Sequence, residues 1–233
     1  MLAFLSVGSC SRSSEAIKGG LREESLRTRT QDSALDKSPL KSFGINLNGF
    51  HFQSGDMGKQ VEDHHFCSKL SDEVTQCVLF DGTSETAHLT GVEYIVSKRM
   101  FESFQPDERK LWHSHVYEVM SGQLVSPGLP DASERQLMTQ LVSTYGKVWH
   151  TWQSQHGEQL PTGPPSLMMA FTADSQLKPE LLHFRNERLQ VSSSEKQKQR
   201  TDMADPGISA GADSWQKADA PQLQVATVRM VKR

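Results

Sequence analysis

Short strand-like runs joined by brief connections are the feature that most restricts the folds open to this chain. Five runs are rich in β-branched and aromatic residues or alternate between apolar and polar positions: 74–80, 91–96, 115–125, 147–153 and 167–172. Parallel neighbours need a long crossover connection, usually a helix, and few of these runs are separated by one. The pattern therefore predicts an α+β domain with a mainly antiparallel sheet and a few flanking helices.

Helical periodicity marks the segments beside these runs. The clearest helix is expected over about 132–145, where apolar residues recur every four positions on one face. Asp131 is placed to cap its first turn, and Glu134 three residues later completes a capping-box pattern. Shorter helices are expected over 97–104 and over 106–111, the second of which has a proline in its first turn.

Composition divides the chain into three parts. Residues 1–43 are rich in Ser, Arg, Lys and Glu without an apolar period, and we expect them to be disordered. Residues 44–190 carry nearly all the aromatic and β-branched clusters and should form the folded domain. Residues 191–233 are expected to be a partly disordered tail with a low-complexity stretch. In this tail the charged run 195–200 should be solvated, and 223–230 has the alternation of an edge strand.

Several classes of protein are disfavoured. No apolar run approaches the ~20 residues that span a bilayer, so we expect a soluble protein without a transmembrane segment. With 25 basic and 28 acidic residues, the chain lacks the positive excess that holds nucleic acid. A glycine-rich phosphate loop and a Gly-x-Ser-x-Gly elbow are both missing, which disfavours nucleotide binding and nucleophilic hydrolysis.

The chain has three cysteines, Cys10, Cys67 and Cys77. An odd number without tight spacing predicts neither a disulfide framework nor a zinc knuckle. Cys67 and Cys77 are therefore expected to be small, buried apolar residues in a protein of a reducing compartment.

Histidines are concentrated in the middle of the chain, where seven of the nine lie between His64 and His156. Imidazole is a common ligand of zinc, iron and copper. His113 and His115 share a face of an extended strand, as do His65 and Cys67, and His150 lies in another strand-like run. If these strands are neighbours, His65, His113, His115 and His150 converge. They are the predicted ligands of a divalent transition metal.

The segment 113–118, His-Ser-His-Val-Tyr-Glu, is similar to the cupin pattern of His-x-His followed by a glutamate. On a regular strand, however, Glu118 points away from His115, and only a bulge would make it a co-ligand. Histidines near aromatic residues are also often core residues that bond to backbone carbonyls. A cupin-like metal-dependent enzyme and a structural core therefore both remain open.

Ordered matches along the chain resemble the oil-body-associated protein family of plants. They lie at 47–51, 64–70, 72–77, 91–94, 111–119, 145–152 and 211–215, so the similarity covers about residues 44–220. Gly49 stands where a larger residue is expected in many members. The resemblance implies a place at seed oil bodies and a part in forming or stabilising them. No catalytic residues are established for the family, so the resemblance assigns none here.

The resemblance makes a peripheral, non-catalytic protein of the oil body (lipid droplet) surface and the cytoplasm our leading prediction. Without a long apolar segment, the chain would attach through an amphipathic segment or a protein partner. The polar stretch 17–26 is a poor anchor, which favours docking through oil body proteins. The alternative is the metal-dependent enzyme described above.

Overall fold

The structure, a computed structural model, describes residues 38–217 and 220–231. The chain divides into two units, 1–42 and 43–233. In the first unit the described residues contain one 3-10 turn, η1 (Pro39–Ser42). The polar stretch 17–26 and most of the predicted disordered segment 1–43 lie outside the described residues.

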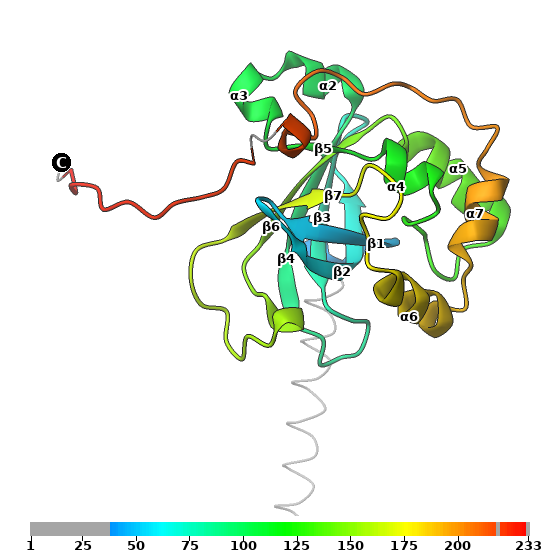
Figure 1. Cartoon of the computed structure of the whole chain (residues 1–233), viewed down its shortest axis with the longest axis horizontal. Helices are drawn as coiled ribbons and strands as arrows, with labels where there is room; N and C mark the ends of the chain where they lie inside the picture. Colours follow the sequence, from blue (N-terminus) through cyan, green and yellow to red (C-terminus); the bar gives the residue numbers. More distant parts are fainter. Residues whose placement is uncertain (1–37, 218–219, 232–233) are drawn as a thin grey trace, which may run out of the picture. The chain divides into compact units, whose positions relative to one another are not determined.

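The second unit contains a seven-stranded, entirely antiparallel sheet (Figure 1). Its strands are β1 (Ile45–Gln53), β2 (Asp56–Lys69), β3 (Val74–Phe80), β4 (Leu89–Val96), β5 (His113–Ser114), β6 (Tyr145–His150) and β7 (Ser166–Ala170). The strand order is β4-β3-β2-β1-β7-β6-β5, and β4 also pairs with β6. That extra pairing closes six strands into a barrel, with β5 attached to β6. The predicted antiparallel α+β class is confirmed.

Strand register determines which side chains face the barrel interior, because residues opposite each other in paired strands share a face. Leu47 lies opposite His65, and Cys67 opposite Cys77. Cys77 in turn lies opposite Glu93, which lies opposite Val148. The interior therefore holds polar groups among aliphatic ones. The buried aliphatic side chains Leu47, Val61, Leu79, Ile95, Val148 and Met168 belong to one cluster, which also includes residues of helix α5.

The helices are α2 (Lys98–Ser103), α3 (Pro106–Arg109), α4 (Val116–Met120), α5 (Asp131–Leu141), α6 (Pro179–Leu189) and α7 (Ser193–Gln199), with 3-10 turns η2 (Ser154–His156) and η3 (Ser214–Lys217). The helices predicted over 97–104, 106–111 and 132–145 correspond to α2, α3 and α5. Figure 1 shows α5 and α7 side by side, where Lys196 pairs with Asp131 and Glu134.

The strand predicted over 115–125 is wrong. His115 instead precedes α4, and the amide of Val119 donates to the carbonyl of His115, as in a helical turn. The chain then reverses at Gly122, which has a φ of +75°. His113 and Ser114, just before this region, pair with β6, and within the region Val125 forms an isolated antiparallel bridge with Asn48 of β1.

The cap predicted for α5 is also wrong. Pro130 is the N-cap, Asp131 is already helical, and no side chain caps the helix. The carboxylate of Glu134 is buried and accepts instead from the amide of Ser126 at 3.0 Å. It also pairs with Lys196 and Arg200, so its side chain is not available to the backbone of its own helix.

Two expectations for the C-terminal part do not hold. The run 195–200 is not simply solvated, because it forms most of α7, and Arg200 is 2% exposed. Its guanidinium donates to the carbonyls of Val119 and Leu124. The alternating stretch 223–230 forms no strand within the described residues 220–231. Gln222 is bonded to the edge of the barrel through Ser54 and Leu167.

Cys67 and Cys77 form a disulfide between β2 and β3, so the prediction of two unpaired cysteines is wrong. The two residues are ten apart in the sequence but directly opposite in the sheet. The strand register brings the two cysteines into contact, and their spacing in the sequence does not reveal that register.

None of the helices in the described part of the chain combines the length and the hydrophobicity that crossing a membrane requires.

Candidate metal centre

Eight ionisable side chains gather in and beside the barrel interior, and each is at most 3% exposed. Five are histidines and three are carboxylates: His51, His65, His113, His115, His150, Asp63, Glu93 and Glu118. Burying this many polar groups is costly unless they bond to one another or to an ion. The arrangement is therefore unusual for a purely structural core.

Glu93 of β4 lies at the centre of one group, which we call the Glu93 cluster: Glu93, His65, His113 and His115. The Nε2 atom of His65 is 3.1 Å from Glu93 Oε2. The Nε2 atoms of His115 and His113 are 3.2 Å and 3.5 Å from Glu93 Oε1. Two ligands bound at about 2.1 Å to one ion lie no more than about 4.2 Å apart, and the three nitrogen–oxygen separations meet this limit. Ligand atoms of Glu93, His113 and His115 also lie within 4.8 Å of one another, whereas His65 groups with Glu93 and His51.

The orientation of His115 follows from its neighbour Thr144. The hydroxyl of Thr144 donates to the carbonyl of Leu141, so its oxygen accepts from His115 Nδ1 at 2.7 Å. This hydrogen bond leaves Nε2 as the nitrogen of His115 that faces the oxygen of Glu93 and can bind an ion.

Asp63 of β2 is the centre of a second group with His51 and His150. Its Oδ2 atom is 2.7 Å from His51 Nδ1 and 3.0 Å from His150 Nε2. Burial raises the pKa of Asp63, but the charge and hydrogen bond of His150 and those of His51 outweigh it, so the pKa lies below its usual value. The ionised Asp63 accepts the Nδ1 proton of His51, which leaves the other nitrogen of His51 as a lone-pair donor.

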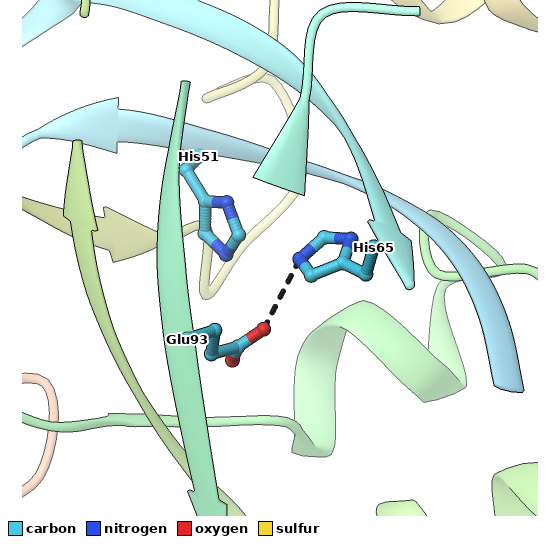
Figure 2. A group of neighbouring side chains, drawn as sticks. All are labelled: His51, His65 and Glu93. Atoms are coloured by element: carbon cyan, nitrogen blue, oxygen red, sulfur yellow. Dashed lines mark ion pairs between the residues drawn. The ribbon is translucent and has the colours of Figure 1, made fainter. Parts of the chain in front are cut away.

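His51 connects the two groups. Figure 2 shows its ring, the ring of His65 and the carboxylate of Glu93 pointing toward one another. One ligand atom from each of the three lies within 4.8 Å of the others. A carboxylate that orients a histidine through one ring nitrogen, so that the other nitrogen faces an ion, is a common support of metal sites.

The pKa shifts agree with a buried anionic centre. Burial raises the pKa of Glu93, but the adjacent imidazoles of His113, His115 and His65 outweigh it and hold the pKa well below its usual range. Burial lowers the pKa of His65, yet the bond to Glu93 raises it above its usual value overall. Burial lowers the pKa of His113 to about 3, so this imidazole is neutral near pH 7 and able to act as a ligand.

Glu118 stands beside the Glu93 cluster, with Oε2 3.8 Å from His113 Nε2. The sequence-based argument that Glu118 points away assumed a strand, whereas helix α4 turns its side chain back toward His113. Burial and the nearby carboxylates, Glu93 first, raise its pKa well above the usual value. Both Glu118 Oε2 and His113 Nε2 are buried without a hydrogen-bond partner.

Two glycines make room for these side chains. A β-carbon at Gly146 would overlap Glu93 Oε1 and His113 Nε2. A β-carbon at Gly91 would overlap the backbone carbonyl of Trp149 and crowd the ring of His150. Beside the cluster is a cavity of about 10 Å³, whose lining includes His51, His65, Glu93, His115 and Glu118. This volume suits one water-sized group.

The structure thus brings together three of the four predicted ligands, His65, His113 and His115, around Glu93. His150 lies in the same barrel but contacts Asp63 instead. Sequence reasoning missed Glu93, Asp63 and His51. A carboxylate within a strand-like run carries no sequence signal of a functional site, so Glu93 and Asp63 were not identified. The alternation of 91–96 shows only that Glu93 and Gly91 share one face of their strand.

Comparison with known proteins identifies the family. Residues 37–204 match the family model described as protein of unknown function (DUF1264). Oil body-associated protein 1B of Arabidopsis thaliana is 38% identical over 88% of this chain and 89% of its own. Oil body-associated protein 1A of Zea mays is 41% identical, over 72% and 71% of the two chains. Oil body-associated protein 2C of Arabidopsis thaliana is 37% identical, over 82% and 83%.

The chain belongs to the oil body-associated protein family. The resemblance predicted from the sequence is confirmed. No solved structure matches this chain.

Proposed function

We propose that this member of the oil body-associated protein family attaches peripherally to the surface of oil bodies and contributes to their formation or stability. The names of its relatives support the location. Attachment at the surface, with a second pool in the cytoplasm, fits helices that are too short and polar to span a bilayer in the described residues. The recruiting surface would be the lipid itself or an oil body protein.

Flotation of cell extracts tests this location. A tagged full-length chain is expected in the floating oil body fraction and should be released by alkaline carbonate, which strips peripheral proteins. Recovery only from the cytosolic fraction would contradict the proposed location. Retention on the oil bodies after carbonate would contradict the peripheral attachment.

A second candidate function is that of a metal-dependent enzyme, and one observation favours it: three imidazole nitrogens surround the buried carboxylate of Glu93. We propose that Glu93, His113 and His115 hold a divalent transition metal. His65 contacts the other oxygen of Glu93, and His51, oriented by Asp63, groups with His65 and Glu93. His150 then supports Asp63 and is not a ligand, which revises its predicted role. A bound metal of this kind supplies a Lewis acid.

The donor set fits such an ion on three independent grounds. Thr144 holds His115 Nδ1, so that Nε2 faces Glu93 Oε1 at 3.2 Å. His113 Nε2 and Glu118 Oε2 are buried without partners. Imidazole and carboxylate together are ligands of zinc, iron and related metals. Glu118, with a raised pKa, would carry a proton beside the ion and is placed to give it up to a bound group.

Elemental analysis of the purified full-length chain separates this candidate from a non-catalytic protein without metal. About one transition metal ion per chain is expected after metal supplementation. Glu93→Gln should lower the affinity of the chain for this ion at least tenfold, since even the loss of a group that supports a metal ligand typically costs that much. His183→Ala is the matched control for His113→Ala, because His183 is exposed and forms an ion pair with Glu187 along its own helix. Equal metal content in all four proteins would contradict the proposed site.

A further inference from the structure

The carboxylate of Glu93 presents its two oxygens to different imidazoles. Oε1 lies 3.2 Å from His115 Nε2 and 3.5 Å from His113 Nε2, the two histidines that we assign to one metal ion. Oε2 lies 3.1 Å from His65 Nε2. A carboxylate that turns one oxygen to each side has the connectivity of a bridge between two ions.

The imidazoles around Glu93 are too widely spread for a single ion. Ligand atoms of Glu93, His113 and His115 lie within 4.8 Å of one another. Those of Glu93, His65 and His51 form a second group of the same compactness. Among the described residues, no such group joins His65 to His113 or to His115. The four imidazoles therefore form two sets, and both sets include Glu93.

The second set is built as metal ligands are. Asp63 holds Nδ1 of His51 at 2.7 Å, and His150 holds Asp63 at 3.0 Å, so Nε2 of His51 is left for an ion. The rings of His51 and His65 and the carboxylate of Glu93 point toward one another (Figure 2). A proton between His65 and Glu93 would satisfy that pair alone, whereas an ion also engages His51. Two imidazoles and a carboxylate suit zinc and related metals.

A cavity of about 10 Å³ lies where the two sets meet. Its lining includes His51 and His65 of the second set, His115 of the first, and Glu93, which belongs to both. Glu118 lines it too, and the remaining walls are aliphatic. A cavity of this volume admits one water-sized group, which would lie against both sets of ligands.

We propose that His51, His65 and Glu93 bind a second divalent transition metal ion. Glu93 bridges the two ions, with Oε1 toward the first and Oε2 toward the second, and ions in such two-metal sites lie about 3.5–4 Å apart. This inference rests on the proposed metal centre. The second ion binds more weakly, because the first already neutralises the shared carboxylate and repels another cation. A count of tightly bound metal therefore gives one ion, and the second binds as the metal concentration is raised.

The test titrates the metal-free full-length chain with cobalt(II), measured by equilibrium dialysis and by EPR. Two ions per chain are expected, the second at the higher cobalt concentration. The EPR signal of the first cobalt should weaken or broaden as the second binds, because two paramagnetic ions that share a carboxylate couple their spins. A second cobalt at an exposed histidine such as His88, which pairs with Asp81, would leave that signal unchanged.

Two variants separate the ions. Asp63→Asn should weaken the second cobalt about tenfold or more and leave the first unchanged, because the carboxylate of Asp63 supports His51. His65→Ala removes a ligand and should abolish the second step. Asp72→Asn is the matched control for Asp63→Asn, since the side chain of Asp72 is 98% exposed, and it should bind both ions as the wild type does.

The wild-type count and spectrum decide the matter even where a variant does not fold. Saturation at one cobalt, or two bound ions with an unchanged first signal, would overturn the second site and leave the proposed first site standing. Equal second affinities of Asp63→Asn and Asp72→Asn, with folding verified by circular dichroism, would also overturn it, as would a second step retained by His65→Ala. A chain that binds no cobalt would remove both sites.

Discussion

Asp213 is a buried carboxylate that holds the strand next to the Glu93 cluster. It is 1% exposed and accepts from both the amide and the hydroxyl of Ser114, at 3.0 and 2.8 Å. Ser114 separates His113 from His115, so Asp213 helps to fix the backbone that carries two candidate ligands. Burial raises the pKa of Asp213 to about 6, because the hydrogen bonds from Ser114 offset only part of the loss of solvation.

Asp213 should make stability depend on pH in a direction opposite to that of most carboxylates. Its folded pKa lies above its unfolded value, so its stabilising contribution is present below about pH 4 and is lost as the pH rises toward about 6. A difference of about two pKa units corresponds to roughly 3 kcal/mol. The free energy of unfolding of Asp213→Asn, relative to that of the wild type, should therefore rise by up to roughly 3 kcal/mol between pH 4 and pH 7.

Urea unfolding at several pH values measures this difference. Asp205→Asn, at an exposed position, is the control and should follow the wild type. Parallel pH profiles of the wild type and Asp213→Asn would contradict the expectation.

The backbone of Gly146 lies outside the left-handed region, so its conformation does not require glycine. Glycine is required there because the packing leaves no room for a β-carbon. Gly146→Ala should displace Glu93 or His113, because the new β-carbon would overlap both. We expect a loss of about 1–3 kcal/mol of stability from overpacking and at least a tenfold loss of metal affinity. Gly44→Ala is the matched control, since a β-carbon there would meet nothing within 4 Å. Metal titration of the two variants checks the prediction, and equal affinities would contradict it.

At the scale of elements, two buried arginines hold the loop that follows α4 and so help to place Glu118. Arg185 of α6 is fully buried and donates to the carbonyl of Gln123 and to Asn48. Arg200, at the end of α7, donates to the carbonyls of Val119 and Leu124. Helix α7, which sequence composition assigned to a tail, thus supports the candidate site together with α6 of the predicted domain.

The disulfide between β2 and β3 is a second element-scale support, and the strand that it ties also carries His65. It closes a short loop, and by loop-closure entropy a loop of about ten residues contributes about 2–3 kcal/mol. The double variant Cys67→Ala, Cys77→Ala should lose about this amount in chemical unfolding. The wild type in a reductant should behave like the variant. An unchanged midpoint in both would contradict a stabilising role.

Four strands were predictable because they alternate or are rich in β-branched residues, as in β3 and β4. Strand β2 was not, since Glu62, Asp63 and His64 interrupt its apolar pattern. The barrel buries both faces of this strand, so polar residues stand on buried positions where sequence rules expect solvent. The strand assigned to 115–125 failed for the reverse reason, because β-branched residues occupy a helix and a bend.

At the scale of the whole molecule, the site was predictable only as far as residue type carries a signal. Histidine is uncommon enough that His65, His113 and His115 were singled out, and the barrel places all three at Glu93. Glu93 itself was not identified, because a carboxylate in a strand is usually a surface residue. Its role arises from closure of the barrel, where β4 pairs with β6 and turns Glu93 inward.

The closed barrel also predicts that metal binding and folding are coupled. Its ligands Glu93, His113 and His115 come from β4, β5 and the start of α4, and they converge only when the barrel is closed. An ion that binds only the folded chain adds about 2.7 kcal/mol at a hundredfold excess over its dissociation constant. For a chain of this size that raises the Tm by about 5–10 °C. Thermal unfolding with and without zinc measures the shift, and Glu93→Gln should abolish it. A Tm that rises equally in both proteins would mean that zinc binds elsewhere, since only the wild type has Glu93 at the meeting point of the three imidazoles.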